Sequence, residues 1–110
     1  MVTQIFGTKK CKDTQKAIRF FKERRWQFQF IDLKEKDISQ GELNSIKRFF
    51  DIEDIIDSDG KEYEKRNLKY MKFNIEDTLL ENPLLFKTPI VRSAKQITIG
   101  YQPEIWKKWQ

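Results

Sequence analysis

The sequence predicts an α/β protein with a βαβ unit at its start and a ββα unit at its end. Two β-favouring runs flank a helical pattern near the start, and two more precede a short amphipathic stretch near the end. The part between them carries helix caps and no sustained alternation. We therefore expect a single domain over residues 1–110. Its core comprises residues 1–35 and 87–110, and residues 36–86 form a helical insertion.

The first unit starts with a short β-favouring run, residues 2–6. A helix follows, because apolar side chains then recur at three- and four-residue spacing. These are Ala17, Ile18, Phe20 and Phe21. Asp13 or Thr14 is the expected N-cap, and Thr8 is a second candidate. Each choice places Cys11, the only cysteine, at or just before the helix N-terminus.

A second strand is expected in residues 26–33, where aromatic side chains alternate with glutamines. This period of two is typical of a half-buried strand. The aromatic positions are Trp26, Phe28 and Phe30. The helix between the two strands is long enough for a right-handed parallel crossover.

The middle segment begins with a capping box, in which Ser39 and Glu42 satisfy each other's free backbone amides. The helix that follows is expected to bury one apolar face. That face comprises Leu43, Ile46, Phe49 and Phe50. We interpret these aromatic residues as core rather than as a binding stripe.

Short elements are expected in the rest of this segment. An acidic helix ends at Asp59-Gly60, and its carboxylates lack the spacing of an EF-hand calcium loop. Residues 61–73 are basic and aromatic, with weak periodicity. Asn74 caps a further helix that ends before Asn82-Pro83.

Strand character returns near the end of the chain. Residues 88–92 and 96–100 are β-rich and are joined by residues 93–95, which predicts a hairpin. Pro103 then starts a final helix that carries Trp106. A βαβ unit followed by a ββα unit, with a thiol directly after the first strand, is the arrangement of the thioredoxin fold.

The composition excludes several classes of protein. With 38% hydrophobic and 14% aromatic residues, a packed interior is expected. The chain has no 18-residue apolar run and does not start like a signal peptide, so we expect no membrane partner. One cysteine cannot form an internal disulfide, which favours a cytoplasmic location. The net charge of +5 is dispersed along the chain, so we expect no direct DNA binding.

The absence of histidine narrows the chemistry further. It removes histidine-based triads and most zinc sites, and a single thiol cannot hold an iron–sulfur cluster. We therefore expect no metal and no bound cofactor. The candidate reacting groups are Cys11, carboxylates, lysines, arginines, tyrosines and backbone amides.

Five stretches of the sequence resemble the arsenate reductase-like (ArsC/Spx) family, in order and spacing, over nearly the whole chain. They are IFGTKKC, FQFIDL, IIDSDGKEYEKRNL, ENPLLFKTPIVR and ITIGYQPEIWKKW. In arsenate reductases of this type, the resemblance implies a cysteine that attacks arsenate and then exchanges with glutathione and a glutaredoxin. Cys11 occupies that position.

The arginines that hold the oxyanion in this family have no counterparts here. One would fall near Ser58 or Asp59, one at Thr88 and one at Tyr101. Loss of charged hydrogen bonds of this kind weakens oxyanion binding by on the order of several kcal/mol. The sequence therefore predicts that this chain does not reduce arsenate by the route that the family's reductases use.

The resemblance also includes Spx-type transcriptional regulators, which bind RNA polymerase and commonly carry a Cys-x-x-Cys switch. The second position of that switch is Thr14 in this chain. A disulfide switch of that kind therefore cannot form within the chain.

Two interpretations of Cys11 follow. A thiolate at a helix N-terminus is stabilised by the helix dipole and free amides, and Lys9, Lys10 and Lys12 add positive potential. Alternatively, Cys11 is a buried small residue beside a solvated face. The resemblance favours the reactive thiol, although Asp13 opposes its activation.

Neighbouring residues are candidates for a substrate or glutathione site. The set comprises Thr8, Lys9, Lys10, Lys12, Thr88, Pro89 and Arg92. Amides at a helix start suit an anion. The resemblance implies that Pro89 is a cis-proline facing the thiol, and Arg92 is a candidate substitute cation.

The leading hypothesis is a thiol-dependent oxidoreductase with Cys11 as its nucleophile. It would use glutathione as co-substrate and glutathione or glutaredoxin as partner. The alternative is a non-catalytic, Spx-like module that contacts RNA polymerase. On balance, these observations favour an enzyme.

Overall fold

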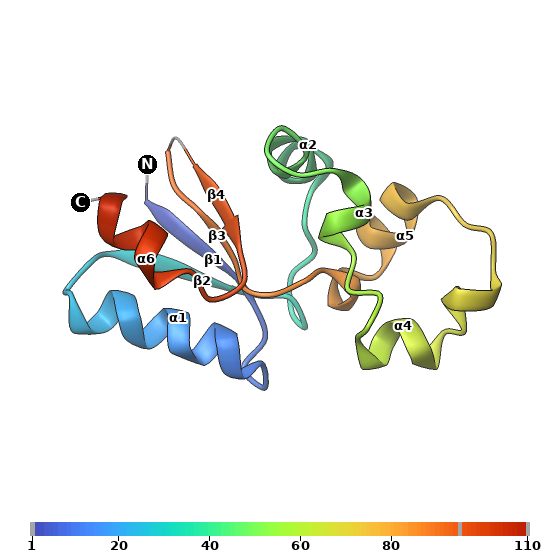
Figure 1. Cartoon of the computed structure of the whole chain (residues 1–110), viewed down its shortest axis with the longest axis horizontal. Coiled ribbons are helices and arrows are strands. Elements are labelled where there is room, and N and C mark those ends of the chain that lie inside the picture. The colour runs from blue at the N-terminus through green and yellow to red at the C-terminus, as the bar shows by residue number, and fades with distance from the viewer. Residues whose placement is uncertain (1, 95, 110) are drawn as a thin grey trace. The chain divides into compact units, whose positions relative to one another are not determined.

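The computed structural model describes residues 2–94 and 96–109 and divides into two compact units (Figure 1). Unit 1 comprises Met1–Asp32 and Thr88–Gln110, and unit 2 comprises Leu33–Lys87. None of the helices in the described part of the chain is long and apolar enough to cross a membrane.

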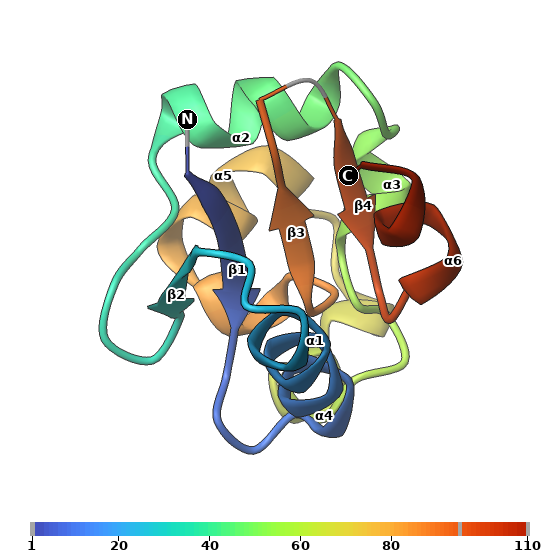
Figure 2. The ribbon, with the colours of Figure 1, turned by 90° about the vertical axis from the view of Figure 1, so that its left-hand side faces the viewer.

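Unit 1 contains a four-stranded mixed sheet in the order β2-β1-β3-β4 (Figure 2). Strand β1 (Thr3–Gly7) pairs in parallel with β2 (Phe28–Asp32). Its other edge pairs antiparallel with β3 (Ile90–Arg92), which pairs antiparallel with β4 (Ile97–Ile99). This confirms the parallel βαβ unit and the C-terminal hairpin. Lys95 of the predicted hairpin turn lies outside the described residues.

Two helices of unit 1 pack against this sheet. Helix α1 spans Lys12–Glu23, and α6 spans Pro103–Trp106 with Pro103 at its first turn, as predicted. A 3-10 turn at Lys107–Trp109 follows α6. The apolar stripe of α1 meets the sheet and Trp106 in one cluster, where the rings of Phe20 and Trp106 lie 5.3 Å apart. The other buried members of the cluster are Ile5, Ala17, Phe21 and Val91.

The predicted caps of α1 were wrong. Helix α1 starts one residue after Cys11, which is itself the N-cap, with an extended backbone (φ −74°, ψ 117°). The amide of Cys11 donates to the carbonyl of Thr8 at 3.2 Å, so a tight turn brings the chain into the helix before Asp13 is reached. Thr14 lies inside the helix and is buried, so its hydroxyl cannot serve as the cap.

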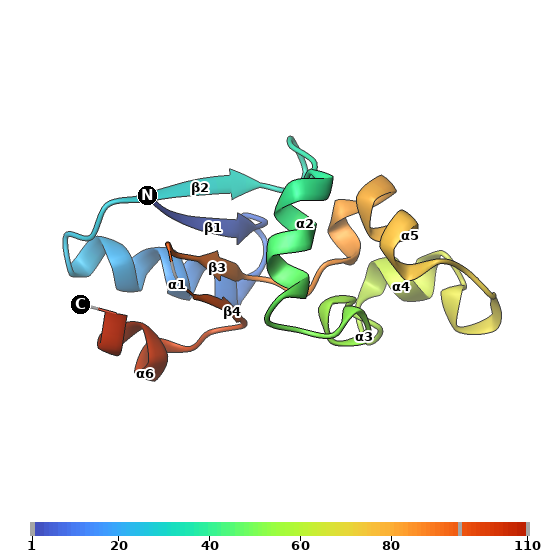
Figure 3. The ribbon, with the colours of Figure 1, turned by 90° about the horizontal axis from the view of Figure 1, so that it is seen from above.

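Unit 2 consists of short helices (Figure 3). They are α2 (Gln40–Lys47), α3 (Ile52–Ile55), α4 (Lys61–Lys65) and α5 (Ile75–Glu81), with 3-10 turns at Leu68–Tyr70 and Pro83–Leu85. Both predicted caps in this unit are confirmed. Ser39 Oγ accepts from the amide of Glu42 at 3.2 Å, and Glu42 Oε1 accepts from the amide of Ser39 at 2.9 Å. Asn74 Oδ1 accepts from the amide of Asp77 at 3.0 Å.

Two predictions for unit 2 need correction. Phe49 is 50% exposed rather than buried, because α2 ends at Lys47 and the periodicity that placed Phe49 on the apolar face ends there. Helix α3 ends at Ile55 rather than near residues 59–60, because Ile56 is extended and forms a β-bridge with Phe86. The weakly periodic residues 61–73 contain α4 and a 3-10 turn, in agreement with the short elements expected there.

Candidate functional site

The turn between β1 and α1 holds the thiol beyond the carboxyl end of β1, an inner strand of the sheet. Lys9 and Lys10 are exposed at this turn, and Cys11 is half-buried. Gly7, which ends β1, is needed there because a Cβ at its position would collide with the side chain of Thr14. The close approach of α1 to the end of β1 therefore fixes where Cys11 lies.

A second segment, 77 residues along the chain, completes the site. Thr88 Oγ1 donates to Cys11 Sγ at 3.1 Å, and Sγ lies 3.9 Å from the carbonyl oxygen of Thr88. The Thr88–Pro89 peptide bond is cis, as the resemblance implies. The carbonyl of Pro89 accepts from the amide of Gly100 at 2.8 Å, which ties this segment to the end of β4.

The pKa of the Cys11 thiol lies below its ordinary value. Burial acts to raise this pKa, but hydrogen bonds from the side chains of Thr14 and Thr88 and from the amides of Thr14 and Asp13 lower it more. The Thr14 hydroxyl oxygen is buried, and no group among the described residues meets standard hydrogen-bond geometry with it. Since a hydroxyl rotates to suit an acceptor, we count it as a donor available to the thiolate.

The helix geometry explains these donors. Cys11 is the N-cap of α1, so its side chain belongs to the residue that precedes the free amides of the first turn. The amides of Asp13 and Thr14 belong to the first helical turn and have no partners within the helix. Hydrogen bonds of this kind favour the charged form of the thiol, and the helix dipole acts in the same direction.

The predicted site residues fall into two groups. Thr8, Lys9, Lys10 and Lys12 flank Cys11 in sequence, but lysine charge is not among the causes of its lowered pKa. Thr88 and Pro89 are brought to the thiol by the fold.

Arg92 is not placed beside the thiol. It lies on β3, and its backbone pairs with Gln4 of β1, three residues before the end of that strand at Gly7. At the ~3.4 Å rise of an antiparallel strand, its backbone lies roughly 10 Å from that end.

The three positions without the expected arginines have different surroundings. Thr88 hydrogen-bonds the thiol. The ring of Tyr101 packs on Trp106 with centroids 5.7 Å apart, and Lys16 Nζ lies over the Tyr101 ring at 5.7 Å. A cation therefore stands beside the position from which an arginine is missing, and sequence reasoning did not identify it.

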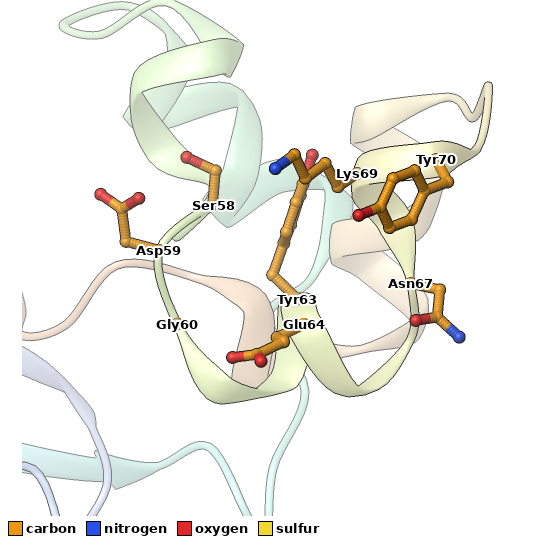
Figure 4. A pocket seen from close by; sticks show the side chains of 8 residues that line it. All are labelled: Ser58, Asp59, Gly60, Tyr63, Glu64, Asn67, Lys69 and Tyr70. Carbon is orange, nitrogen blue, oxygen red and sulfur yellow. The ribbon is translucent and has the colours of Figure 1, made fainter.

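Ser58 and Asp59 line a hollow in unit 2 (Figure 4). In this view they form one rim, Lys69 and Tyr70 form the other, and Tyr63 stands between them. Tyr70 is 82% exposed and Asn67 has a left-handed backbone (φ 55°). The hollow mixes both signs of charge and contains no thiol.

Thr14 is a functional candidate that sequence reasoning missed. The signal was available in principle, because the residue three positions after an N-cap faces the capping side chain. It was hidden because the cap was assigned to Asp13 or Thr14 rather than to Cys11. No group of three or more metal-ligating side chains occurs among residues 2–94 and 96–109.

Comparison with known proteins places this geometry in context. The family model described as the ArsC family matches residues 6–109. A global transcriptional regulator Spx from Streptococcus pyogenes is 28% identical over 109 residues, which cover 94% of this chain and 81% of the regulator.

Solved structures show the same fold. A putative ArsC family related protein from Bacteroides fragilis has a TM-score of 0.83 at 20% identity, covering 100% of both chains. An arsenate reductase from Vibrio cholerae has a TM-score of 0.80 at 20% identity, covering 98% of this chain and 97% of that one. NrdH-redoxin from Escherichia coli, a glutaredoxin-like protein, matches at a TM-score of 0.52 and 12% identity, covering 100% of this chain and 96% of that one. The predicted thioredoxin-like α/β fold is confirmed.

Proposed function

The chain belongs to the ArsC family, and we propose that it is a thiol-dependent oxidoreductase whose nucleophile is Cys11. The observation that carries this proposal is the set of donors around Sγ, above all the Thr88 hydroxyl at 3.1 Å. They lower the pKa of Cys11, which raises the fraction of thiolate near neutral pH. The thiolate is the form that attacks a disulfide.

The proposed reaction is thiol–disulfide exchange. The Cys11 thiolate attacks one sulfur of a substrate disulfide, a bond forms between Cys11 and that sulfur, and the other sulfur leaves as a thiolate. Glutathione thiolate then attacks the substrate's sulfur in this mixed disulfide. Cys11 is released as thiolate, and the substrate departs joined to glutathione. Electrons balance, because each step breaks one sulfur–sulfur bond and forms another.

The chain's own residues have distinct roles in this scheme. The amides of Asp13 and Thr14 and the hydroxyls of Thr14 and Thr88 stabilise Cys11 as nucleophile and again as leaving group. Thr8, Lys9, Lys10, Lys12, Thr88 and Pro89 are proposed to line the entry for glutathione. Arg92 is left out, because the fold places its backbone away from the thiol.

Mass spectrometry and an exchange assay test this function. We expect oxidised glutathione to form an adduct on Cys11 that reduced glutathione or a glutaredoxin removes, and we expect Cys11→Ser to form none. Arsenate serves as a second substrate, for which we expect no reduction because the oxyanion arginines are absent. An unmodified wild-type chain after prolonged incubation would refute the proposal.

A second function is favoured by the 28% identity to Spx over 94% of this chain. In this alternative, the protein is a non-catalytic module that contacts RNA polymerase. Co-purification with RNA polymerase that is unchanged by Cys11→Ser, together with failure of the adduct test, supports the module over the enzyme.

A further inference from the structure

Charge is divided unevenly between the two units. Residues 1–32 and 88–110 contain twelve Lys and Arg against four Asp and Glu, a net charge of +8. Residues 33–87 contain ten against thirteen, a net charge of −3. The overall +5 thus conceals a strongly basic unit that carries the thiol.

The exposed face of α1 concentrates part of this charge. Lys12, Lys16 and Arg19 are exposed and spaced by four and then three residues, so they form one row that starts beside Cys11. At 1.5 Å per residue, the row extends about 10 Å from the thiol end of the helix. None of the three belongs to an ion pair among the described residues. Like charges at this spacing destabilise an isolated helix, and an anionic partner would remove that repulsion.

A groove lined by residues of α1, of α6 and of the segment before α6 includes Lys16 and Arg19 of this row. Its cations are Lys16, Arg19, Arg24 and Lys107, and its two carboxylates are Glu23 and Glu104. Glu104 is already paired with Lys107 at 3.3 Å. Two of the cations, Lys16 and Arg24, lie over aromatic rings.

These two cation–ring contacts are specific. The guanidinium of Arg24 lies 4.0 Å from the centroid of the Phe20 ring, and Lys16 Nζ lies 5.7 Å from that of Tyr101. Such contacts attract a cation to the face of the ring. The groove therefore combines positive charge with the aromatic rings of Phe20 and Tyr101, along the helix that starts directly after Cys11.

We propose that the α1–α6 groove binds an acidic segment of the protein whose disulfide reacts with Cys11; this inference rests on the proposed function. A row of about 10 Å matches three to four extended residues at ~3.3 Å each. The partner chemistry is therefore two or three Asp or Glu side chains within four residues of the reacting cysteine. A nucleic acid fits less well, since Glu23 and Glu104 would face the phosphates of any longer strand.

Three peptides of equal length test this inference. Each carries one cysteine as its 2-pyridyl disulfide, followed by three Glu, three Gln or three Lys. Attack by Cys11 releases pyridine-2-thione, which is followed by absorbance. Each rate constant is divided by that of 2-mercaptoethanol with the same peptide, which removes differences in intrinsic reactivity.

We expect the wild-type chain to prefer the Glu peptide over the Gln peptide by about tenfold at low salt, a modest electrostatic enhancement of association. The preference falls as salt increases. Lys16→Glu and Arg19→Glu each reduce it severalfold. Lys22→Glu is the matched control, because Lys22 is exposed on α1 but outside the groove, and it leaves most of the preference in place.

The outcomes separate the two proposals. Equal rates with all three peptides, or an equal loss in Lys22→Glu and Arg19→Glu, overturn the groove and leave the thiol chemistry intact. No reaction with any peptide overturns the proposed function and the groove with it. Tighter binding of a 12-nucleotide single strand than of the Glu peptide, measured by fluorescence anisotropy, also overturns the inference.

Discussion

The two units of this chain differ in what holds them together and in what they expose. In unit 1, the central cluster places the rings of Phe20, Phe21 and Trp106 against a sheet. In unit 2, the buried apolar side chains of the described residues are aliphatic apart from Phe86, and the helices have four to eight residues. Unit 1 carries a net charge of +8 and unit 2 a net charge of −3.

This difference separates two ways of building a site. A reactive thiol needs donors held at fixed positions, and in unit 1 the end of an inner strand packed against a 12-residue helix provides them. Helices as short as those of unit 2 are marginal on their own and depend on caps and tertiary packing. We therefore assign the chemistry to unit 1 and expect the four variants below to separate the behaviour of the two units.

Trp106→Ala has the largest expected effect. Trp106 is fully buried, and its indole nitrogen donates to Thr98 Oγ1 at 2.8 Å. Removing this side chain is expected to cost about 3–5 kcal/mol of the free energy of unfolding. Urea titration followed by tryptophan fluorescence measures it, because Trp26 and Trp109 remain and both lie in unit 1.

Leu79→Ala is the comparison variant in unit 2, where Leu79 is fully buried in α5. Its loss is expected to cost about 2–5 kcal/mol. We expect it to move the transition seen by far-ultraviolet circular dichroism more than the one seen by tryptophan fluorescence. An equal or larger shift in fluorescence would show that the two units unfold as one.

Ser39→Ala has a smaller expected effect. It removes the capping oxygen that accepts from the amide of Glu42 at the start of α2, which typically costs about 1 kcal/mol. Circular dichroism in urea measures the loss, and the Cys11 alkylation rate serves as the control for unit 1. A change in that rate would contradict the separation of the two units.

Thr88→Val has the smallest expected effect on stability but acts on the thiol. It removes the hydroxyl that donates to Sγ at 3.1 Å, so the pKa of Cys11 rises toward its ordinary value. The pH profile of iodoacetamide alkylation should shift to higher pH. An unchanged profile would mean that the Thr14 hydroxyl and the helix amides set the thiolate fraction without Thr88.

The lowered pKa of Cys11 also has a consequence for stability. A group whose pKa falls on folding stabilises the folded state above its unfolded pKa, and this contribution is lost as pH falls through the folded pKa. The wild-type chain should therefore gain stability relative to Cys11→Ser as pH rises through that window. Parallel urea titrations of both proteins across this range measure the difference, which would vanish if the folded pKa were ordinary.

Local sequence determined much of this protein. Alternation predicted β2, the Ser39 capping box predicted α2, Pro103 predicted the start of α6, and the order of elements predicted the thioredoxin-like fold. These features depend on residues a few positions apart, through capping hydrogen bonds and the spacing of apolar side chains. They can therefore be predicted without the tertiary structure.

The tertiary structure decided the rest of the site. It made Cys11 the N-cap of α1, brought Thr88 to its sulfur from 77 residues away and left Arg92 paired with Gln4 instead. It also gathered the dispersed charge into one basic and one acidic unit. The physical reason is that donors and charges act over a few ångströms of space, and sheet pairing and helix packing determine which residues share that space.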